Sequence, residues 1–185
     1  MEDVPGPEAP EEPPVWDQPP ADEPPSPPPH AVDDGPGEAA DTGDAVVEYL
    51  AFRLGSEEYA VRVEDVLEII RLQKITDVPR APGFVRGIIS LRGVIIPVFD
   101  IKKRLGFDEA EHTRATRIVV VSEEGMPQGV IVDKVTGVVR FPMKTIEPPP
   151  AVIGGVEAEY IQGVGRMGDR LLILLNTGRI LAMEG

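Results

Sequence analysis

Apolar residues occur in short runs from residue 46 onward, each bounded by glycine, proline or charged side chains. Residues 49–54 and 57–63 alternate large apolar with small or polar side chains on either side of Gly55-Ser56. Alternation with a period of two around a turn signal is typical of a β-hairpin. The ordered part of the chain is therefore predicted to begin near Val46 with two antiparallel strands.

A second hairpin is predicted further along the chain. Residues 85–91 and 94–99 are rich in β-branched side chains, and Arg92-Gly93 separates them. These runs are too short for helices, so they indicate two buried strands joined by a tight turn. A guanidinium at such a turn needs an oxygen partner if it is partly buried, and can meet another protein if it is not.

Two short helical turns are predicted between the strands. The i, i+3, i+4, i+7 spacing of a helix is followed by Val63, Val66, Leu67 and Ile70, before the chain returns to strand. Asp100 is expected to be the N-cap of a helix over residues 101–105. Three cations of that helix are expected to face solvent: Lys102, Lys103 and Arg104.

The chain repeats itself. A shift of 69 residues places the apolar positions of 50–71 on those of 119–140, and a shift of 76 places 84–105 on 160–181. The second half is thus the first half with seven residues inserted, in a proline-marked loop. Repeated short strands with glycine turns predict an all-β fold of two small barrels. The first half spans about residues 46–106 and the second about 114–182.

Composition sets the N-terminal segment apart. Residues 1–44 hold 13 of the 21 prolines, 13 of the 32 acids and no Lys or Arg. This composition cannot bury enough apolar surface to offset chain entropy, so a disordered Pro-rich acidic leader is predicted over residues 1–45. The P-x-x-P spacing in 24–29 leaves an SH3-type ligand open, but without a basic residue to orient it a solvated spacer is favoured.

The charge of the remaining chain is nearly balanced, with 19 acids against 18 Lys and Arg. A nucleic-acid partner is not expected, because the basic excess of such proteins is missing. The chain has no cysteine, no secretory signal and no apolar run long enough for a bilayer. These features predict a soluble cytoplasmic protein with no direct membrane insertion.

A comparison of the two halves suggests a site. Under the two shifts Glu68 falls on Gly137 and Arg92 falls on Gly168. A residue required by the fold should occur in both copies, so neither charge is required by the barrel. We predict that Glu68 and Arg92 pair at the surface of the first barrel and belong to a protein-binding site. The alternative, an incidental surface ion pair worth about 0–1 kcal/mol, stays open at this point.

No catalytic, cofactor or metal site is expected. The run 163–168 fits G-x-G-x-x-G, but a strand-like run follows it where a dinucleotide site needs a helix, so a hairpin turn is predicted. His30 and His112 lie in the leader and in a polar loop without a base or ligand partner nearby. Asp133 is expected to be a capping or turn residue rather than a general base.

Five blocks of sequence resemble the CheW coupling proteins of bacterial chemotaxis. In order, these blocks are residues 48–59, 66–69, 84–100, 130–133 and 168–175. The resemblance covers about residues 47–181. It implies two intertwined five-stranded SH3-like barrels and a non-catalytic adaptor that joins the cytoplasmic tips of chemoreceptors to the regulatory barrel domain of the histidine kinase CheA.

The resemblance also implies site residues. The receptor-facing region would consist of Val66, Glu68, Gly87, Leu91, Arg92 and Gly93. The kinase-facing surface would include the neighbourhood of Leu50 and Val63. Ser90 stands where Asn is common in the family, which removes hydrogen-bonding capacity there. The alternatives are a coupling protein of a non-flagellar pathway, such as pilus motility or development, and a generic SH3-like module that binds peptide or RNA.

Overall fold

The computed structural model describes residues 45–108, 111–150, 152–153 and 156–183. The predicted leader lies outside these residues, apart from Ala45. The elements of the first half are β1 (Val46–Leu54), β2 (Glu57–Arg62), the 3-10 turn η2 (Val63–Asp65), β3 (Val66–Arg71), β4 (Val85–Leu91), β5 (Val94–Phe99) and α1 (Ile101–Arg104).

The second half repeats the five strands and the final helix, lacks a 3-10 turn in the place of η2, and adds β9, β10 and two other 3-10 turns. It consists of β6 (Arg117–Glu123), β7 (Met126–Val132), β8 (Lys134–Pro142), the 3-10 turn η3 (Met143–Thr145), β9 (Val152–Ile153), β10 (Val156–Glu157), the 3-10 turn η4 (Ala158–Tyr160), β11 (Ile161–Met167), β12 (Arg170–Leu175) and α2 (Thr177–Leu181). Under the shift of 76, β4 and β5 coincide residue for residue with β11 and β12. The added β9–β10 pair occupies the loop where the sequence places its insertion.

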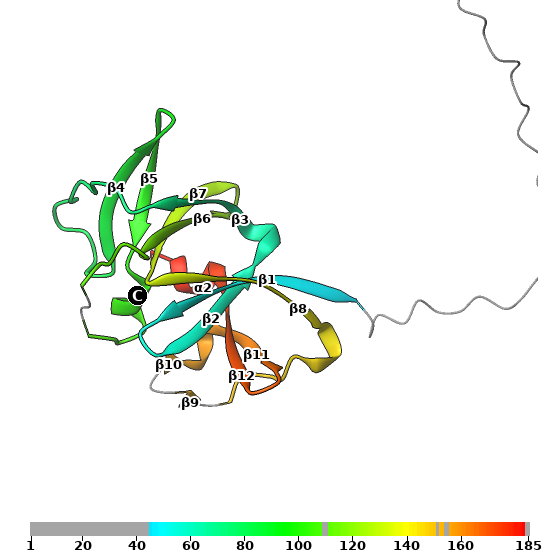
Figure 1. The fold of residues 1–185 in the computed structure, drawn as a ribbon. Coiled ribbons are helices and arrows are strands. Elements are labelled where there is room, and N and C mark those ends of the chain that lie inside the picture. Colours follow the sequence, from blue (N-terminus) through cyan, green and yellow to red (C-terminus); the bar gives the residue numbers. More distant parts are fainter. Residues whose placement is uncertain (1–44, 109–110, 151, 154–155, 184–185) are drawn as a thin grey trace, which may run out of the picture. The chain divides into compact units, whose positions relative to one another are not determined.

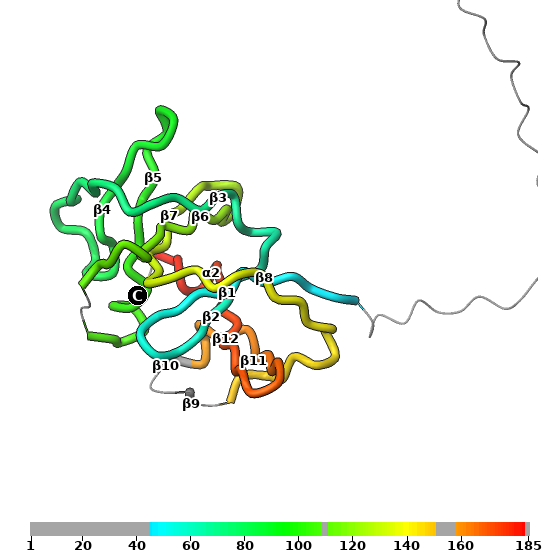
Figure 2. Tube along the Cα trace, viewed as in Figure 1, coloured from blue at the N-terminus to red at the C-terminus, as the bar shows by residue number. Residues whose placement is uncertain are grey.

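Each five-stranded sheet combines strands of both halves. One sheet has the order β11-β12-β2-β1-β8, and the other has the order β3-β6-β7-β5-β4. Strands of the two halves pair in antiparallel fashion in β1 with β8 and in β3 with β6, which can be followed in Figures 1 and 2, and in parallel fashion in β2 with β12 and in β5 with β7. We call the two units the β1 barrel and the β6 barrel.

A bridge beyond the strands joins the two edges of each sheet. In the β6 barrel, Thr76 follows edge strand β3 and exchanges two backbone hydrogen bonds, of 2.9 and 2.8 Å, with Ile88 of the other edge strand β4. In the β1 barrel, Glu147 follows β8 and pairs in the same way with Val164 of β11. A sheet whose edges meet is closed. The predicted all-β fold of two intertwined five-stranded SH3-like barrels is confirmed.

Three hydrophobic clusters hold this arrangement together. Each barrel encloses its own small core, and the repeat relates the two, since Tyr49 and Leu172 in one occupy the places of Ile118 and Ile96 in the other. The third and largest cluster lies between the barrels and includes Phe52, with residues of both halves. Burial between the sheets therefore joins the two barrels through one shared core.

The two barrel interiors are filled differently at one matched pair of positions. In the β1 barrel the ring of Phe141 lies so close to Gly165 that a Cβ there would stand 2.7 Å from the ring. The matched positions in the β6 barrel are Leu72 and Ile89, which both pack in its core. A larger side chain on one strand is thus offset by a smaller one on the other, as close packing requires.

Two of the helical predictions need correction. The 3-10 turn ends at Asp65, and the positions from Val66 to Ile70 form strand β3. The helix-like spacing arises because Leu67 is an extra residue in a β-bulge opposite β6, which shifts the alternation by one position. Thr136, the matched residue of β8, is the extra residue of the equivalent bulge against β1.

The N-cap prediction is confirmed, because the Asp100 carboxylate accepts hydrogen bonds from the backbone N–H groups of Lys102 and Lys103. The prediction that Lys102 and Arg104 face solvent is wrong. Lys102 is buried, and its Nζ donates to both oxygens of Asp133 at 2.9 and 3.2 Å. The Arg104 guanidinium lies 4.2 Å from the ring centre of Phe84, a cation–π contact. Lys103 is exposed, as predicted, so one face of the helix meets solvent while the others pack on the barrels.

Candidate protein-binding site

The turn between β4 and β5 holds Arg92 in an unusual backbone conformation. Arg92 and Gly93 both have positive φ, at 51° and 81°. Leu91 and Val94 pair across the turn, so the loop has two residues and the pattern of a type I′ turn. Glycine adopts this conformation freely, whereas an arginine in it is strained. A strained, exposed arginine is a feature typical of functional positions.

Arg92 and Glu68 form the predicted pair. Arg92 Nη1 donates to Glu68 Oε1 at 2.9 Å, and Nη2 donates to Oε2 at 3.0 Å. The arginine side chain is 77% exposed and the glutamate side chain 24%. Glu68 comes from β3, so the pair ties the tip of the β4–β5 hairpin to the edge strand of the β6 barrel. This bidentate geometry fixes the orientation of both groups.

Exposed apolar side chains are the neighbours in sequence of this ion pair. Leu67 and Ile69, on either side of Glu68, are 56% and 42% exposed. Val94 and Ile95, just after the turn, are 51% and 60% exposed. We call these four residues, with Glu68 and Arg92, the Glu68–Arg92 surface. These four residues were not predicted from sequence, because apolar and β-branched side chains in short strands are typical of a core. For Leu67 and Ile69, the β-bulge at Leu67 decides which side chains of β3 face outward.

Three other predicted receptor-facing residues lie partly or wholly beneath the surface. Val66 and Leu91 are half-buried and pack against the hydrophobic clusters. Gly87 is buried, and a Cβ there would stand 2.2 Å from the backbone oxygen of Thr76. Gly163, its match in the β1 barrel, is crowded in the same way by Glu147. Gly87 is therefore required by the bridge that closes the barrel.

The predicted kinase-facing residues differ in exposure. Leu50 is 4% exposed and belongs to the core between the barrels, so it can shape a partner surface only from beneath. Val63 is half-buried in η2 and borders an open hollow of about 750 Å³. The hollow is lined by Val46, Val47, Glu48, Arg62, Val63, Glu64, Arg140 and Met143. We call it the Val63 hollow.

Asp133 joins three segments at the boundary between the barrels. Its carboxylate accepts hydrogen bonds from the Lys102 ammonium and, at 2.7 Å, from the backbone N–H of Gly55. Its own backbone N–H donates to the Arg53 carbonyl at 3.0 Å. These contacts connect the end of β7 with α1 and with the β1–β2 turn. Asp133 is therefore a structural residue, in line with the prediction of a capping or turn role.

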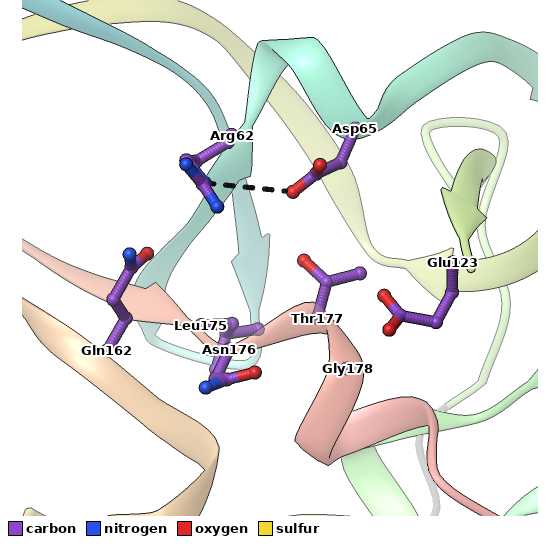
Figure 3. A pocket seen from close by; sticks show the side chains of 8 residues that line it. All are labelled: Arg62, Asp65, Glu123, Gln162, Leu175, Asn176, Thr177 and Gly178. Carbon is purple, nitrogen blue, oxygen red and sulfur yellow. Dashed lines mark ion pairs between the residues drawn. The ribbon is translucent and has the colours of Figure 1, made fainter. Parts of the chain in front are cut away.

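A polar pocket of about 240 Å³ lies at the position related to Lys102 by the repeat (Figure 3). Gly178 of α2 takes the place of Lys102, so no lysine side chain fills the space. Glu123 and Asp65 face the pocket, and Arg62 lies 3.9 Å from Asp65. Burial, and then the charges of Glu124 and Asp65, raise the pKa of the Glu123 carboxyl. A Cβ at Gly178 would stand 2.8 Å from Glu123 Oε1, so the glycine lets the Glu123 carboxylate approach α2.

No group of three potential metal ligands occurs among the described residues. Within the same ranges, no helix has the length and apolar composition of a membrane span. Protein contact is the chemistry for which the Glu68–Arg92 surface is suited, because it combines exposed apolar area with one oriented ion pair.

Comparison with known proteins settles the family. The model of the CheW-like domain matches residues 48–185. This chain belongs to the CheW-like domain family. The match begins two residues into β1.

Individual CheW-like relatives agree with this assignment. The chain is 31% identical to "Chemotaxis protein CheW" of Klebsiella aerogenes over 137 residues, covering 74% of this chain and 82% of the relative. It is 35% identical to "Protein FrzA" of Myxococcus xanthus over 136 residues, covering 72% and 84%. A crystal structure of scaffolding protein TtCheW from Thermoanaerobacter tengcongensis superposes with a TM-score of 0.71 at 32% identity, covering 80% and 96%. Both barrels are thus shared with a scaffolding protein.

Proposed function

We propose that this chain is a non-catalytic adaptor that couples chemoreceptors to the histidine kinase CheA in a chemotaxis-type signalling array. Its membership of the CheW-like family supports this, as does the relative named a scaffolding protein. The observation that carries the proposal is the Glu68–Arg92 pair, a feature of one barrel that the fold does not require, with exposed apolar residues next to it in sequence on β3 and β5. The protein works in the cytoplasm, at arrays of membrane receptors.

The Glu68–Arg92 surface is the proposed contact with the receptor tip. Burial of Leu67, Ile69, Val94 and Ile95 supplies free energy at about 25 cal/mol per Å² of apolar surface. Most of that energy does not depend on orientation, whereas charge–charge contacts do. The fixed pair therefore sets the register of a receptor helix on this surface. Val66, Leu91, Gly87 and Gly93 hold the strand and the turn in place.

The Val63 hollow is the proposed contact with the regulatory barrel domain of the kinase. Val63, Val46 and Met143 supply apolar area, and charged residues rim the hollow. Leu50 packs in the core between the barrels and so holds β1, which lines the hollow, in place. The two proposed contacts lie on different barrels, since the pair is on the β6 barrel and β1 and β8 line the hollow.

Bridging is the mechanism that this arrangement supports. The adaptor changes no covalent bond, and it acts by holding a receptor and a kinase in one assembly. A receptor that changes its contact with one barrel alters the free energy of the kinase contact through the contacts between the barrels, which include the shared core and the bonds of Asp133 to Lys102 and Gly55. Those interior contacts make the two barrels respond as one body.

A coupling protein of a non-flagellar pathway is the second candidate. The relative FrzA is 35% identical to this chain and carries a name other than chemotaxis protein. Both candidates share the same two contacts and differ in the receptor and kinase that are bound.

The proposal is tested by co-purification from the native cell. The tagged full-length protein should bring down a histidine kinase and a chemoreceptor together, and the identity of these two proteins separates the chemotaxis pathway from other pathways. The Arg92→Ala variant should retain the kinase and lose most of the receptor. Recovery of neither partner with the unaltered protein would overturn the proposal.

A further inference from the structure

Three arginines gather around a hollow of about 370 Å³ at the start of β6. It is lined by Arg71, Leu72, Thr113, Arg114, Thr116 and Arg117. The repeat relates these positions to the Val63 hollow, since Arg71 matches Arg140 and Arg117 matches Glu48. The two barrels thus carry related hollows with different charge. We call this one the arginine hollow.

Arg71 of β3 and Arg117 of β6 lie directly opposite each other on two adjacent strands. The register of β3 and β6 pairs Arg71 directly with Arg117, whereas the matched pair in the β1 barrel is Arg140 with Glu48. Arg140 Nε donates to Glu48 Oε1 at 2.6 Å. Like charges directly opposite in an antiparallel pair are destabilising, whereas opposite charges stabilise it. The β6 barrel therefore keeps an unfavourable pair where the fold accepts a favourable one.

The arginines of the hollow lack acidic partners. Among the described residues, no carboxylate forms an ion pair with Arg71, Arg114 or Arg117, and Arg117 donates to the backbone carbonyls of Arg114 and Thr116 at 2.8 Å. The loop that carries them is held by Thr113 and Thr116, where the Thr113 N–H donates to Thr116 Oγ1 at 2.8 Å. The positive charge is thus concentrated and held in place, in a chain of net charge −14.

We infer that the arginine hollow binds an acidic segment of a partner protein, with two or three carboxylates entering among the guanidinium groups. Arginine presents a planar fork of donors that matches a carboxylate in bidentate fashion. A hollow of this size admits a few carboxylates, not an extended surface. Anionic membranes and nucleic acids are disfavoured partners, because residues 45–185 carry 19 acids against 18 Lys and Arg, and three guanidinium groups make a local patch rather than the extended basic surface that such partners need. This site shares no residue with the two contacts proposed above.

The test uses a fluorescein-labelled peptide of eight glutamates and the full-length protein at low salt, followed by fluorescence anisotropy. Arg71→Glu should weaken binding by at least about tenfold, since it removes one guanidinium and places a carboxylate in the hollow. Arg140→Glu is the matched control. It changes the net charge equally, at the related position of the other barrel, and should alter the affinity by less than about twofold.

Stability provides an independent readout. Arg71→Glu converts a like-charged pair into an opposite-charged pair, as in the β1 barrel but with the two signs exchanged, so the variant should unfold at the same or a higher temperature while it loses the peptide. A lower melting temperature, or equal weakening by Arg71→Glu and Arg140→Glu, would overturn the inference. So would failure of the unaltered protein to bind the peptide, or binding of inorganic phosphate or phosphatidylserine vesicles in preference to it. None of these results depends on a receptor or a kinase, so the adaptor proposal stands or falls separately.

Discussion

Arg92 binds Glu68 through both arms of its guanidinium while its own backbone stays in the left-handed region, at a φ of 51°. An asparagine before Gly93 would suit this turn better, because Asn-Gly is the preferred pair for type I′ geometry. An exposed ion pair contributes only about 0–1 kcal/mol to folding. The chain therefore keeps an arginine that the turn disfavours, as expected if the side chain serves binding.

Arg92→Asn separates folding from binding. The free energy of unfolding should stay within about 1 kcal/mol of the original value, because relief of backbone strain offsets the loss of the ion pair. Affinity for the receptor fragment should fall by about tenfold. Urea unfolding and a binding titration measure the two effects. A large loss of stability with unchanged affinity would mean that the arginine serves the fold.

Lys102→Ala should destabilise the protein strongly. It leaves the Asp133 carboxylate without its ammonium partner at the boundary between the barrels, and removing one partner of a buried pair costs about 3 kcal/mol. Lys102→Met removes the same ion pair but keeps most of the apolar length of the side chain, so it should destabilise the protein less than Lys102→Ala does. Chemical denaturation of both variants measures this difference. A change below about 0.5 kcal/mol for Lys102→Ala would show that the pair does not hold the barrels together.

Glu123→Gln should stabilise the protein at neutral pH. Burial and two neighbouring acids raise the pKa of Glu123 in the folded state, so its ionised form disfavours folding. That penalty disappears as the pH falls through the raised folded pKa to the ordinary carboxyl range. The variant should therefore melt a few degrees higher than the original protein at pH 7 and equally at low pH.

Glu58→Gln is the control with the opposite sign. Arg170 donates hydrogen bonds to the Glu58 carboxylate, one of them from Nε to Oε2 at 3.2 Å. These bonds hold the pKa of the Glu58 carboxyl below its ordinary value. Glu58 therefore stabilises the fold above the ordinary carboxyl pKa, and this contribution is lost as the pH falls through the lowered folded pKa. Glu58→Gln should melt lower at pH 7 and equally at low pH. Melting curves in which both variants shift the same way would contradict these assignments.

Gly165→Ala should destabilise the β1 barrel because the new methyl group meets the ring of Phe141. Overpacking of a filled core costs about 1–3 kcal/mol. Adding Phe141→Leu, the residue type at the matched position Leu72, should restore part of that loss. A double variant no more stable than Gly165→Ala alone would show that the two interiors are not interchangeable in this way.

Much of the fold was predictable because the chain carries its plan twice. The positions of β4 and β5 and the N-cap Asp100 could be checked against a second copy in the same sequence. The Glu68–Arg92 pair was found from a difference between the copies. By contrast, the bulge at Leu67 adds one residue to β3, and nothing in the composition of the strand indicates it. The resulting spacing of apolar residues resembled that of a helix, so a helical turn was predicted where the chain forms a strand.

Side-chain exposure was harder to predict than strand positions. Lys102 and Leu50 show why, because each lies at the boundary between the barrels, which no single strand pattern reveals. Lys102 follows a strand as a polar residue and was expected in solvent, yet its partner Asp133 comes from the other half of the chain. Each sheet combines strands of both repeats, so such contacts depend on the order of the strands in the sheets. The sequence near each residue does not encode that order.

Retention of the kinase on an immobilised receptor fragment tests the central claim most directly. CheA from the same cell should stay bound to the receptor's cytoplasmic fragment when this protein is present and wash off when it is absent. Arg92→Ala should reduce the retained CheA, while still binding CheA in solution. Retention of CheA that is equal with and without this protein would contradict the account.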